Sequence, residues 1–498
     1  MTNVTRLSAL LLSACLLLSV LPCAQAETSN LAEDISGTEL ITDHVGFYGA
    51  HKLFDKNTIE CKRIEGSSSL TLSHEAGIGS LYLIFDLECS NYTVTNNDTG
   101  ESHIWGDKGF LHEFVDLEGT FGAAPKSVTL TFGENPMFLN EIYAFTSGEV
   151  PDFVQKWEVP RENETDLILF STHGDDEQLF FAGILPYYAG ELDYEVLVVY
   201  LTNHRNFTRE RCHEMLNGLW AVGATTYPVF GGFPDFHIKD KAGAYSMFKQ
   251  AGYDEDALTA YVVENIRRFK PKIAVGHDPL GEYGHGQHMV YSEVLQNAVQ
   301  RTMDPGYFPD SAEKYGVWDV PKTYLHLYEE NPIVMDWDQP LERFDGLTAF
   351  QVTKNLGFTC HVSQYWDFAW YMSGCDLATQ VPKYSPCEYG LFRSTVGDDV
   401  QKNDFFENVL TYDQEARKAE QEEQARLEAE RLAQEKAQQE TEEPLPAQTL
   451  PQESEPEESK PAQSPQPQKT MLLVCVALAI LAAIVLVLLL LMLLKKRY

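Results

Sequence analysis

The sequence predicts two folded domains, an all-β sandwich followed by an α/β domain with a doubly wound, mostly parallel sheet. Residues 27–150 hold short runs of β-branched and aromatic residues separated by Gly, Asn, Asp and Pro clusters, which is typical of sandwiches. From about residue 165 onward, apolar strand-like runs alternate with helical runs, which is the pattern of βαβ units. Apolar segments near both ends of the 498-residue chain indicate export and membrane anchoring.

The β-rich part is expected to form two packed sheets of the sandwich or jelly-roll type. Each of its clearest strand signals is short and bounded by turn-forming residues. These signals are Ser69–Ser73, Ser80–Leu87, Ser127–Phe132 and Phe138–Thr146. Their spacing along the chain favours a sandwich.

The α/β domain is expected over residues 155–400, with a Rossmann-like sheet. The expected strands are Asp166–Thr172, Glu195–Thr202, Tyr227–Phe230, Lys272–Gly276 and Thr323–Tyr328. The expected helices are a run that ends at Ala189, then Thr208–Val222, Asp254–Phe269 and Gly286–Met303. Because helical runs separate the strands, we expect neighbouring strands to be parallel.

The two ends of the chain predict a single-pass membrane protein. Residues 1–26 read as a secretory signal, with Arg6 before the apolar stretch Leu7–Leu21. Met471–Leu494 contains no charged residue and is long enough to span a bilayer, and the basic tail 495–498 follows it. We therefore expect a type I protein of the cell membrane, with an extracytoplasmic ectodomain at the cell surface.

The composition becomes polar between the α/β domain and the expected transmembrane helix. Residues 401–441 end in a stretch rich in Glu, Gln, Ala, Lys and Arg, where Leu427 and Leu432 are the only leucines. This composition predicts a solvated helical stalk, because a sustained coiled-coil seam needs more apolar heptad positions. Residues 442–470 are rich in Pro, Gln and Glu, and we expect an extended linker.

Charge and cysteine usage narrow the class of protein. The chain has 37 basic and 74 acidic residues, a formal net charge of −37. This balance argues against a nucleic-acid partner, because binding to the phosphate backbone needs clustered Lys and Arg. Six cysteines lie between residues 27 and 470, and an even number in an exported protein permits disulfides. Cys61–Cys89 is one compatible pair, and the sequence does not select a connectivity.

A first polar cluster stands where the first strand of the α/β domain is expected to end. It reads Thr172-His173-Gly174-Asp175-Asp176-Glu177. Sites in open α/β sheets form beyond the carboxyl ends of the strands. A His and two carboxylates there can bind a metal ion, and their burial is unfavourable without a neutralising partner. The alternative is an exposed acidic helix N-terminus, which the helix dipole favours.

A second polar cluster follows the strand expected at Lys272–Gly276. It contains His277-Asp278-Pro279 and the segment Gly281–His288. His285 and His288 are three residues apart, so on a helix they share a face. Two such clusters at equivalent ends of one sheet together predict a three-ligand metal site with an open fourth position, which is what a catalytic zinc ion needs.

Over residues 165–370 the chain resembles the PIG-L/LmbE-like metal-dependent de-N-acetylases. The first motif of this family is His-Pro-Asp-Asp-Glu, matched by residues 173–177. The second resembles Gly-Glu-Tyr-Gly-His-Pro-Asp-His, matched by residues 281–288. Further segments resemble the family as well: Arg211-x-x-Glu214, Gly232-Phe233-Pro234-Asp235 and His361-Val362-Ser363-Gln364. The chain departs from the motifs at Gly174 and Gly286, which replace Pro, and at Gln287, which replaces Asp.

The resemblance implies which residues bind the metal and which one takes a proton. It assigns His173, Asp176 and His288 to a Zn²⁺ ion or another divalent metal. It makes Asp175 the general base. A carboxylate beside a metal-activated water can accept a proton as the water attacks an acetamide carbon.

The resemblance also implies how the rest of the site acts on the substrate. Tyr283 and His285 would stabilise the tetrahedral oxyanion, and His285 would help to protonate the leaving amine. Arg211 and Asp235 would hold sugar hydroxyls. For Arg211, a helical ion pair with Glu214 is the simpler alternative.

In the N-terminal part, short pieces resemble a discoidin-like (galactose-binding-like) jelly roll. These pieces are Leu53-Phe54-Asp55, Ser127–Leu130 and Leu139–Tyr143. This resemblance implies carbohydrate binding. The alternative is a domain that only packs against its neighbour.

Together, these features predict a membrane-anchored, zinc-dependent de-N-acetylase. Its expected substrate is the acetamide of an N-acetylglucosamine-type sugar in an extracytoplasmic glycan or glycoconjugate. Two alternatives stay open. One is a non-catalytic carbohydrate-binding surface protein, and the other is a metal-dependent amidase or esterase that acts on another substrate.

Overall fold

The computed structural model describes residues 30–203 and 209–441. The signal peptide at 1–26, the linker at 442–470, the transmembrane helix at 471–494 and the tail lie outside these ranges and stay predictions. No helix within the described ranges combines the length and apolar character that a membrane crossing requires.

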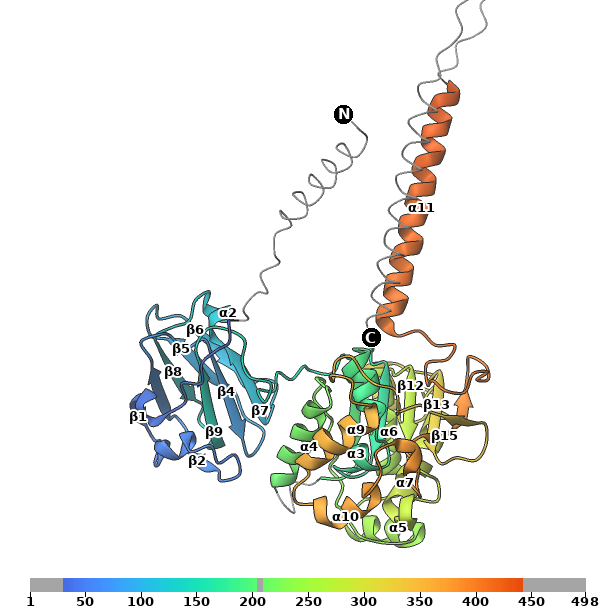
Figure 1. Cartoon of the computed structure of the whole chain (residues 1–498), viewed down its shortest axis with the longest axis horizontal. Coiled ribbons are helices and arrows are strands. Elements are labelled where there is room, and N and C mark those ends of the chain that lie inside the picture. Colours follow the sequence, from blue (N-terminus) through green and yellow to red (C-terminus); the bar gives the residue numbers. More distant parts are fainter. Residues whose placement is uncertain (1–29, 204–208, 442–498) are drawn as a thin grey trace, which may run out of the picture. The chain divides into compact units, whose positions relative to one another are not determined.

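The N-terminal part consists of two antiparallel sheets (Figure 1). The five-stranded sheet has the order β1 (Ile41–Val45), β3 (Ser69–Ser73), β8 (Ser127–Phe132), β5 (Tyr92–Asn96), β6 (Ser102–Trp105). The four-stranded sheet has the order β2 (Lys62–Ile64), β9 (Met137–Phe145), β4 (Ser80–Phe85), β7 (His112–Asp116). Three short helices accompany them: η1 (Thr38–Leu40), η2 (Ala50–Phe54) and α2 (Leu117–Phe121).

A single hydrophobic core joins the two sheets, so the expected all-β sandwich is confirmed. Strand β3 alternates half-buried and buried residues, and its Leu70 and Leu72 face inward, as a strand with one buried face requires. They pack in the same core as Leu81 and Leu83 from β4 of the other sheet. The four strand signals of the sequence coincide with β3, β4, β8 and β9. The strands β1, β2, β5, β6 and β7 were not predicted.

The second part is built on a six-stranded sheet with the order β11 (Val196–Tyr200), β10 (Leu167–Ser171), β12 (Ile273–Gly276), β13 (Lys322–His326), β15 (Glu388–Ser394), β14 (Pro332–Val334). The first four strands are parallel, β15 is antiparallel to β13, and β14 is antiparallel to β15. The expected mostly parallel sheet is therefore confirmed. Within this sheet the polypeptide runs first through β10, then through β11 at the edge, and then through β12 on the other side of β10. The strand order reverses there, which is where open α/β sheets form their sites.

Helices cover both faces of this sheet (Figure 1). Alternate residues of the parallel strands face opposite layers: Leu167 and Leu169 pack with α4 (Glu210–Ala221), while Ile168 and Phe170 pack with α6 (Glu255–Phe269) and α7 (Gly286–Val299). Burial on both faces explains why these strands are continuously apolar. The other helices are α3 (Asp176–Leu179), η3 (Leu185–Glu191), α5 (Lys241–Gln250), η5 (Glu282–Gly284), α8 (Pro309–Tyr315), α9 (Ala349–Val352), η6 (Thr353–Gly357), η7 (Phe358–Cys360), α10 (Tyr365–Met372) and η8 (Ala378–Gln380).

Two expected elements of the α/β part are wrong. The strand expected at Tyr227–Phe230 makes only isolated bridges, one of them between Val199 and Val229. The helical run expected to reach Ala189 is split into α3 and the π-helical η3. Gly183 adopts a φ of 99° between them, a left-handed conformation that ends a helix.

The described cysteines form no disulfide. Cys89 is buried in the β-sandwich, while Cys61 is half-buried. The pairing of these two residues, which the sequence permitted, does not occur.

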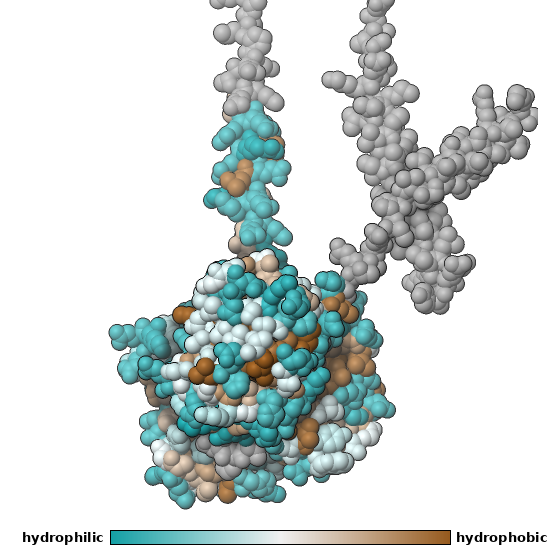
Figure 2. All heavy atoms as spheres, turned by 90° about the vertical axis from the view of Figure 1, so that its left-hand side faces the viewer, coloured by the Kyte–Doolittle hydropathy of each residue, from teal (hydrophilic) through white to brown (hydrophobic). Residues whose placement is uncertain are grey.

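Helix α11 (Tyr412–Thr441) corresponds to the expected stalk, although it begins later than residue 401. Its first residues are fixed at the amino ends of the parallel strands. The Tyr412 backbone amide donates to Asp166 Oδ1 at 2.8 Å, just before β10, and Glu415 accepts from Lys272 Nζ at 2.7 Å, just before β12. The described part of α11 beyond this root is almost wholly hydrophilic (Figure 2), as expected for a solvated helix.

Two buried histidines connect the β-sandwich to helix α4. His112 Nε2 of β7 and His213 Nδ1 of α4 are 2.8 Å apart, and His112 Nδ1 lies 2.6 Å from the Tyr82 hydroxyl. Burial, with a smaller contribution from His213, lowers the pKa of His112 well below its usual range. Burial lowers the pKa of His213 to about 4, against a small opposing effect of Asp86. Both rings are therefore neutral at pH 7.

This pair predicts a loss of stability in acid. Because the folded pKa values lie below the unfolded value of about 6.5, the unfolded chain takes up protons first. The stabilisation is complete above about pH 6.5 and is lost as the pH falls toward 4, by an amount on the order of 2–3 kcal/mol. Thermal unfolding midpoints measured between pH 8 and 4 should fall less steeply for His213→Gln than for the parent chain. Parallel curves for the two proteins would contradict this origin of the acid sensitivity.

Candidate metal centre and active site

The polar clusters of the sequence meet at the reversal of strand order. His173 to Asp176 follow the carboxyl end of β10, and His277 follows the carboxyl end of the neighbouring strand β12. Helix α7 begins at Gly286 and brings His288 in its first turn. The side chains of His173, Asp176, His277 and His288 are all buried. The alternative of an exposed acidic helix N-terminus is therefore wrong.

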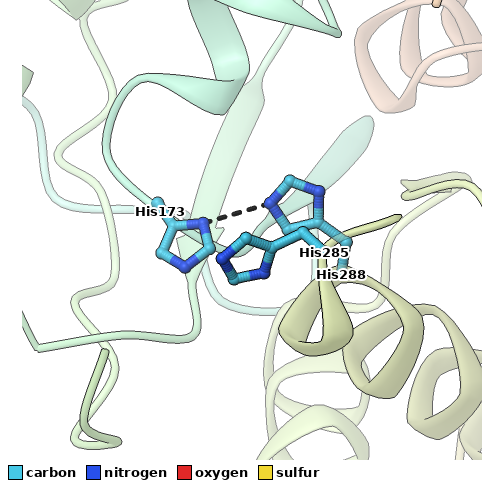
Figure 3. A group of neighbouring side chains, drawn as sticks. All are labelled: His173, His285 and His288. Atoms are coloured by element: carbon cyan, nitrogen blue, oxygen red, sulfur yellow. Dashed lines mark hydrogen bonds between the residues drawn. The ribbon is translucent and has the colours of Figure 1, made fainter. Parts of the chain in front are cut away.

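Three side-chain atoms form a nearly equilateral triangle. His173 Nδ1 lies 3.1 Å from Asp176 Oδ2 and 3.1 Å from His288 Nε2. Asp176 Oδ2 lies 3.2 Å from His288 Nε2. Ligand atoms on a tetrahedral zinc ion with bonds of about 2.0–2.1 Å are about 3.3 Å apart. Figure 3 shows the His173 and His288 rings facing each other, with His285 beside them.

Hydrogen bonds decide which of the clustered histidines can act as ligands. His277 Nε2 accepts from the Thr172 amide at 3.0 Å, and His277 Nδ1 lies 2.9 Å from a carboxylate oxygen of Glu282. His285 Nδ1 accepts from the Gln287 amide at 3.2 Å. These lone pairs are already engaged, although both rings lie close enough to the triangle to take part in a metal site. The triangle of His173, Asp176 and His288 is therefore the donor set that fits a divalent metal.

A buried carboxylate, Glu282, orients the His288 ligand. Glu282 Oε2 accepts from His288 Nδ1 at 2.7 Å and also from His277 Nδ1, while Glu282 Oε1 lies 2.6 Å from His326 Nδ1. Burial opposes ionisation, but His277 and the other two histidines hold the pKa of Glu282 well below its usual range. With Nδ1–H donated to Glu282, the Nε2 lone pair of His288 is directed at the metal site.

Gln287 orients the His173 ligand, as Glu282 orients His288. Its Oε1 lies 3.2 Å from His173 Nε2, which leaves the Nδ1 lone pair of His173 for the metal. The same oxygen accepts from the Phe236 amide at 2.8 Å, and Gln287 Nε2 donates to the Pro234 carbonyl at 2.9 Å. Gln287 thus joins a metal ligand to the loop that carries Asp235.

Asp175 lies beside the donor triangle and against a buried arginine. Arg211 Nη2 is 3.5 Å from Asp175 Oδ2 and donates to the Gly174 carbonyl at 3.3 Å. Burial raises the pKa of Asp175 to about 6, although Arg211 opposes this shift. The simpler alternative for Arg211, a pair with Glu214, is wrong because Glu214 accepts from the Ser363 amide and hydroxyl instead.

Asp235 reaches the same site from the loop that follows the isolated bridge at Phe233. Its Oδ1 lies 3.4 Å from His173 Nε2, and its Oδ2 lies 3.6 Å from Arg211 Nη1. The carboxylate is only partly buried. The structure therefore brings together both residues that the sequence suggested for sugar hydroxyls.

Tyr283 and His285 form the rim over the donor triangle. Tyr283 has a φ of 45°, a left-handed conformation that is strained for a bulky residue and that often marks a functional position. Its ring lies 5.4 Å from the His285 ring and 6.1 Å from Phe368. Because His285 Nδ1 accepts a hydrogen bond from the Gln287 amide, its neutral ring carries the proton on Nε2.

The two glycines that replace motif prolines are explained by their neighbours. A Cβ at Gly174 would lie 2.2 Å from Met215 Sδ, and one at Gly286 would lie 2.4 Å from the Asp240 carbonyl oxygen. The Gly286 amide also donates to the Ile238 carbonyl at 2.7 Å, a bond that Pro cannot make. These departures let helix α4 and the loop before α5 pack closely around the site.

Several site residues were missed or given a weaker role by sequence reasoning. Glu282 and Gln287 lay inside the second motif, but the pattern did not indicate that each orients a ligand. His326 lies in no motif, and it is buried against Glu282. His361 lies 3.2 Å from Glu177 in a buried pair. A search for histidines elsewhere in the chain as partners of the acidic motif residues Glu177 and Glu282 could have indicated His326 and His361.

The geometry defines an α/β protein with a buried His–Asp–His metal site and an adjacent carboxylate. Residues 168–299 match the PIG-L family, whose model is described as GlcNAc-PI de-N-acetylase. These residues contain both motifs and all three donors of the triangle. Residues 168–299 therefore form a domain of the PIG-L/LmbE type.

Individual proteins are similar over part of the chain. A Rhodococcus jostii protein, named 1D-myo-inositol 2-acetamido-2-deoxy-alpha-D-glucopyranoside deacetylase, is 29% identical over 34% of this chain. The match spans 64% of that relative's length, which is less than two thirds.

Solved structures are similar to each part of the chain. An N,N'-diacetylchitobiose deacetylase from Pyrococcus horikoshii covers 46% of this chain and 83% of its own, with 12% identity and a TM-score of 0.30. The CpGH89CBM32-6 protein of Clostridium perfringens covers 23% of this chain and 92% of its own, with 15% identity and a TM-score of 0.17.

Replacement of Glu282 by Gln should weaken metal binding. An amide has one acceptor oxygen and places N–H groups against imidazole N–H groups, so the orientation of His288 is lost. We expect the metal affinity to fall by about 10- to 100-fold, measured by competition with a chelator. Glu293→Gln, on the outer part of α7, is the matched control and should bind as the parent does. Unchanged affinity in Glu282→Gln would contradict the orienting role.

The contact between Gly174 and Met215 predicts a coupled pair of substitutions. Gly174→Ala forces a methyl group into Met215 and should cost about 1–3 kcal/mol of stability. In Gly174→Ala/Met215→Ala the space is restored, so the two effects should be less than additive. Denaturant unfolding of the two single variants and the double variant measures this coupling. If the changes in the free energy of unfolding are strictly additive, the Met215 side chain is not the reason that residue 174 must be glycine.

Proposed function

We propose that this protein is a membrane-anchored, metal-dependent de-N-acetylase. The substrate would be an N-acetylglucosamine-type sugar in an extracytoplasmic glycan or glycoconjugate, and the products would be a free amine and acetate. The observation that carries the proposal is the donor triangle of His173, Asp176 and His288 with Asp175 beside it. The family match and the printed activity of the Rhodococcus jostii relative support the same reaction.

The metal that fits the three donors best is Zn²⁺, because it accepts two imidazoles and a carboxylate and keeps a position open. When bound, Zn²⁺ supplies Lewis-acid polarisation and lowers the pKa of water to about 7. His173 and His288 present lone pairs that Gln287 and Glu282 have oriented. The protein thus contributes a prearranged donor set.

Asp175 is proposed to handle the proton of the attacking water. Its carboxylate accepts that proton as the C–O bond forms at the acetamide carbon, and it then delivers the proton to the nitrogen as the C–N bond breaks. Arg211, 3.5 Å away, holds the carboxylate in place. Water is thereby divided between the acetate and the amine, and no further reactant is needed.

Tyr283 and His285 are proposed to stabilise the negative oxygen of the tetrahedral intermediate. Both carry an X–H group at the rim of the site, and such donors stabilise developing charge. The neutral tautomer of His285 makes it a hydrogen-bond donor more than an acid. Arg211 and Asp235 are proposed to bind sugar hydroxyls, with Asp235 the more exposed of the two.

A non-catalytic glycan-binding protein is the second candidate. The observation that favours it is the separate β-sandwich with its own core. The buried and oriented donor set argues against it, because a binding module has no use for a carboxylate beside three metal donors. The proposed surface location rests on the sequence of the two termini.

Asp175→Asn separates chemistry from metal binding. The variant should keep about one metal ion per chain, while acetate release from N-acetylated sugars falls by about 10²- to 10⁴-fold. His288→Ala should lose both the metal and the activity. Asp310→Asn, on the exposed helix α8, is the control and should match the parent. Full activity in Asp175→Asn, or no acetate release by the metal-loaded parent, would sink the proposal.

A further inference from the structure

Helix α10 (Tyr365–Met372) stands beside the mouth of the active site and is rich in aromatic residues. On its inner face, Phe368 lies 6.1 Å from the ring of Tyr283. Tyr371 fixes the helix through Phe180, with ring centroids 5.2 Å apart. Phe180 in turn lies 5.8 Å from the His288 ring. The position of α10 is therefore set by the residues that surround the metal site.

The other side of α10 borders a hollow of about 400 Å³. Its walls are α10 and the segment 353–360, and the rings of Phe358, Tyr365 and Trp366 line it. Phe358 and Tyr365 stack with centroids 5.5 Å apart. Trp366 stands edge-on to Tyr365 and is 87% exposed. So large an exposed aromatic surface at the edge of a hollow is typical of a binding site.

Polar groups lie among these rings. Asn355, Thr359 and Ser373 line the hollow. The Thr359 hydroxyl donates to backbone carbonyls of its own helix turn, so it offers a ligand its acceptor oxygen. This mixture suits a sugar, because the apolar face of a pyranose packs on aromatic rings while its hydroxyls bond to amides and hydroxyls. The volume lies in the range of small-ligand sites, about 300–1,000 Å³.

Charge favours a neutral ligand over an anionic one. The one basic side chain that lines the hollow, Lys354, already donates to the Cys375 carbonyl at 2.6 Å. Asp367 is exposed next to Trp366. Phosphate groups and anionic lipid headgroups need a cluster of free cations, which the described walls of the hollow do not offer.

We propose that this hollow is a second glycan-binding site that holds a neutral sugar residue against Trp366. The proposal rests on the proposed function and deepens it. Helix α10 borders the hollow and contacts Tyr283 through Phe368, and the same glycan chain is proposed to reach from the metal site to Trp366. The substrate class is then an N-acetylated oligosaccharide or longer glycan, and a single sugar binds at the metal site alone.

The test compares a long and a short ligand on the full chain. The parent carries Asp175→Asn to prevent turnover, and calorimetry measures its binding of β-1,4-linked N-acetylglucosamine tetrasaccharide and of the monosaccharide. Adding Trp366→Ala should weaken tetrasaccharide binding by about 5- to 10-fold, as expected for a lost aromatic contact. Monosaccharide binding should not change. Trp370→Ala is the matched control, because Trp370 lies on the same helix, is 55% exposed and does not line the hollow.

Each outcome has a distinct meaning. Equal tetrasaccharide binding with and without Trp366 would overturn the second site, and so would an equal loss for both ligands. Binding to neutral phosphatidylcholine vesicles that disappears only in Trp366→Ala would assign the hollow to lipid and also overturn it. The second site and the hydrolysis can fail separately. If Trp366→Ala selectively weakens tetrasaccharide binding but the protein with its native Asp175 releases no acetate, the second site is supported and the proposed hydrolysis is not.

Discussion

The hydrogen bonds around Glu282 are the constraint on which the metal site depends. A fully buried carboxylate needs strong donors. Three histidines supply them: His277 just after β12, His288 in α7 and His326 at the end of β13. The same bonds fix which nitrogen of His288 carries its proton. Two neighbouring strands and a helix are thereby held in one arrangement by the same carboxylate that orients the His288 ligand.

Sequence reasoning predicted the strongly patterned parts of the fold. Strands β3 and β8 and helix α6 have clear periodicity and turn signals at their ends, and the structure places them where expected. Edge strands such as β1 and β6 were missed because none of their residues is fully buried, so they carry no apolar alternation. The split at Gly183 depends on a distant side chain, Trp337, which would touch any Cβ there. Local patterns do not contain that information.

The residues of the candidate site also divide into those that the sequence pattern predicted and those that it missed. Residues inside motifs, such as His173 and His288, were found because their types and spacing suit a metal. The role of Arg211 was under-weighted, since its partner Asp175 is 36 positions away and a nearer carboxylate was available. Glu282 and Gln287 act only through contacts made in three dimensions. The departures at Gly174 and Gly286 likewise acquire a reason only when Met215 and Asp240 are seen against them.

The root of helix α11 has a practical consequence. Tyr412 and Glu415 are bound beside Asp166 and Lys272, at the amino ends of the strands, whereas the metal donors lie beyond the carboxyl ends. The polypeptide therefore leaves the strands of this sheet at the edge opposite the metal donors. A sensor chip or resin attached at this root should leave the metal donors facing the solution, so that large polymers can approach them unhindered by the support.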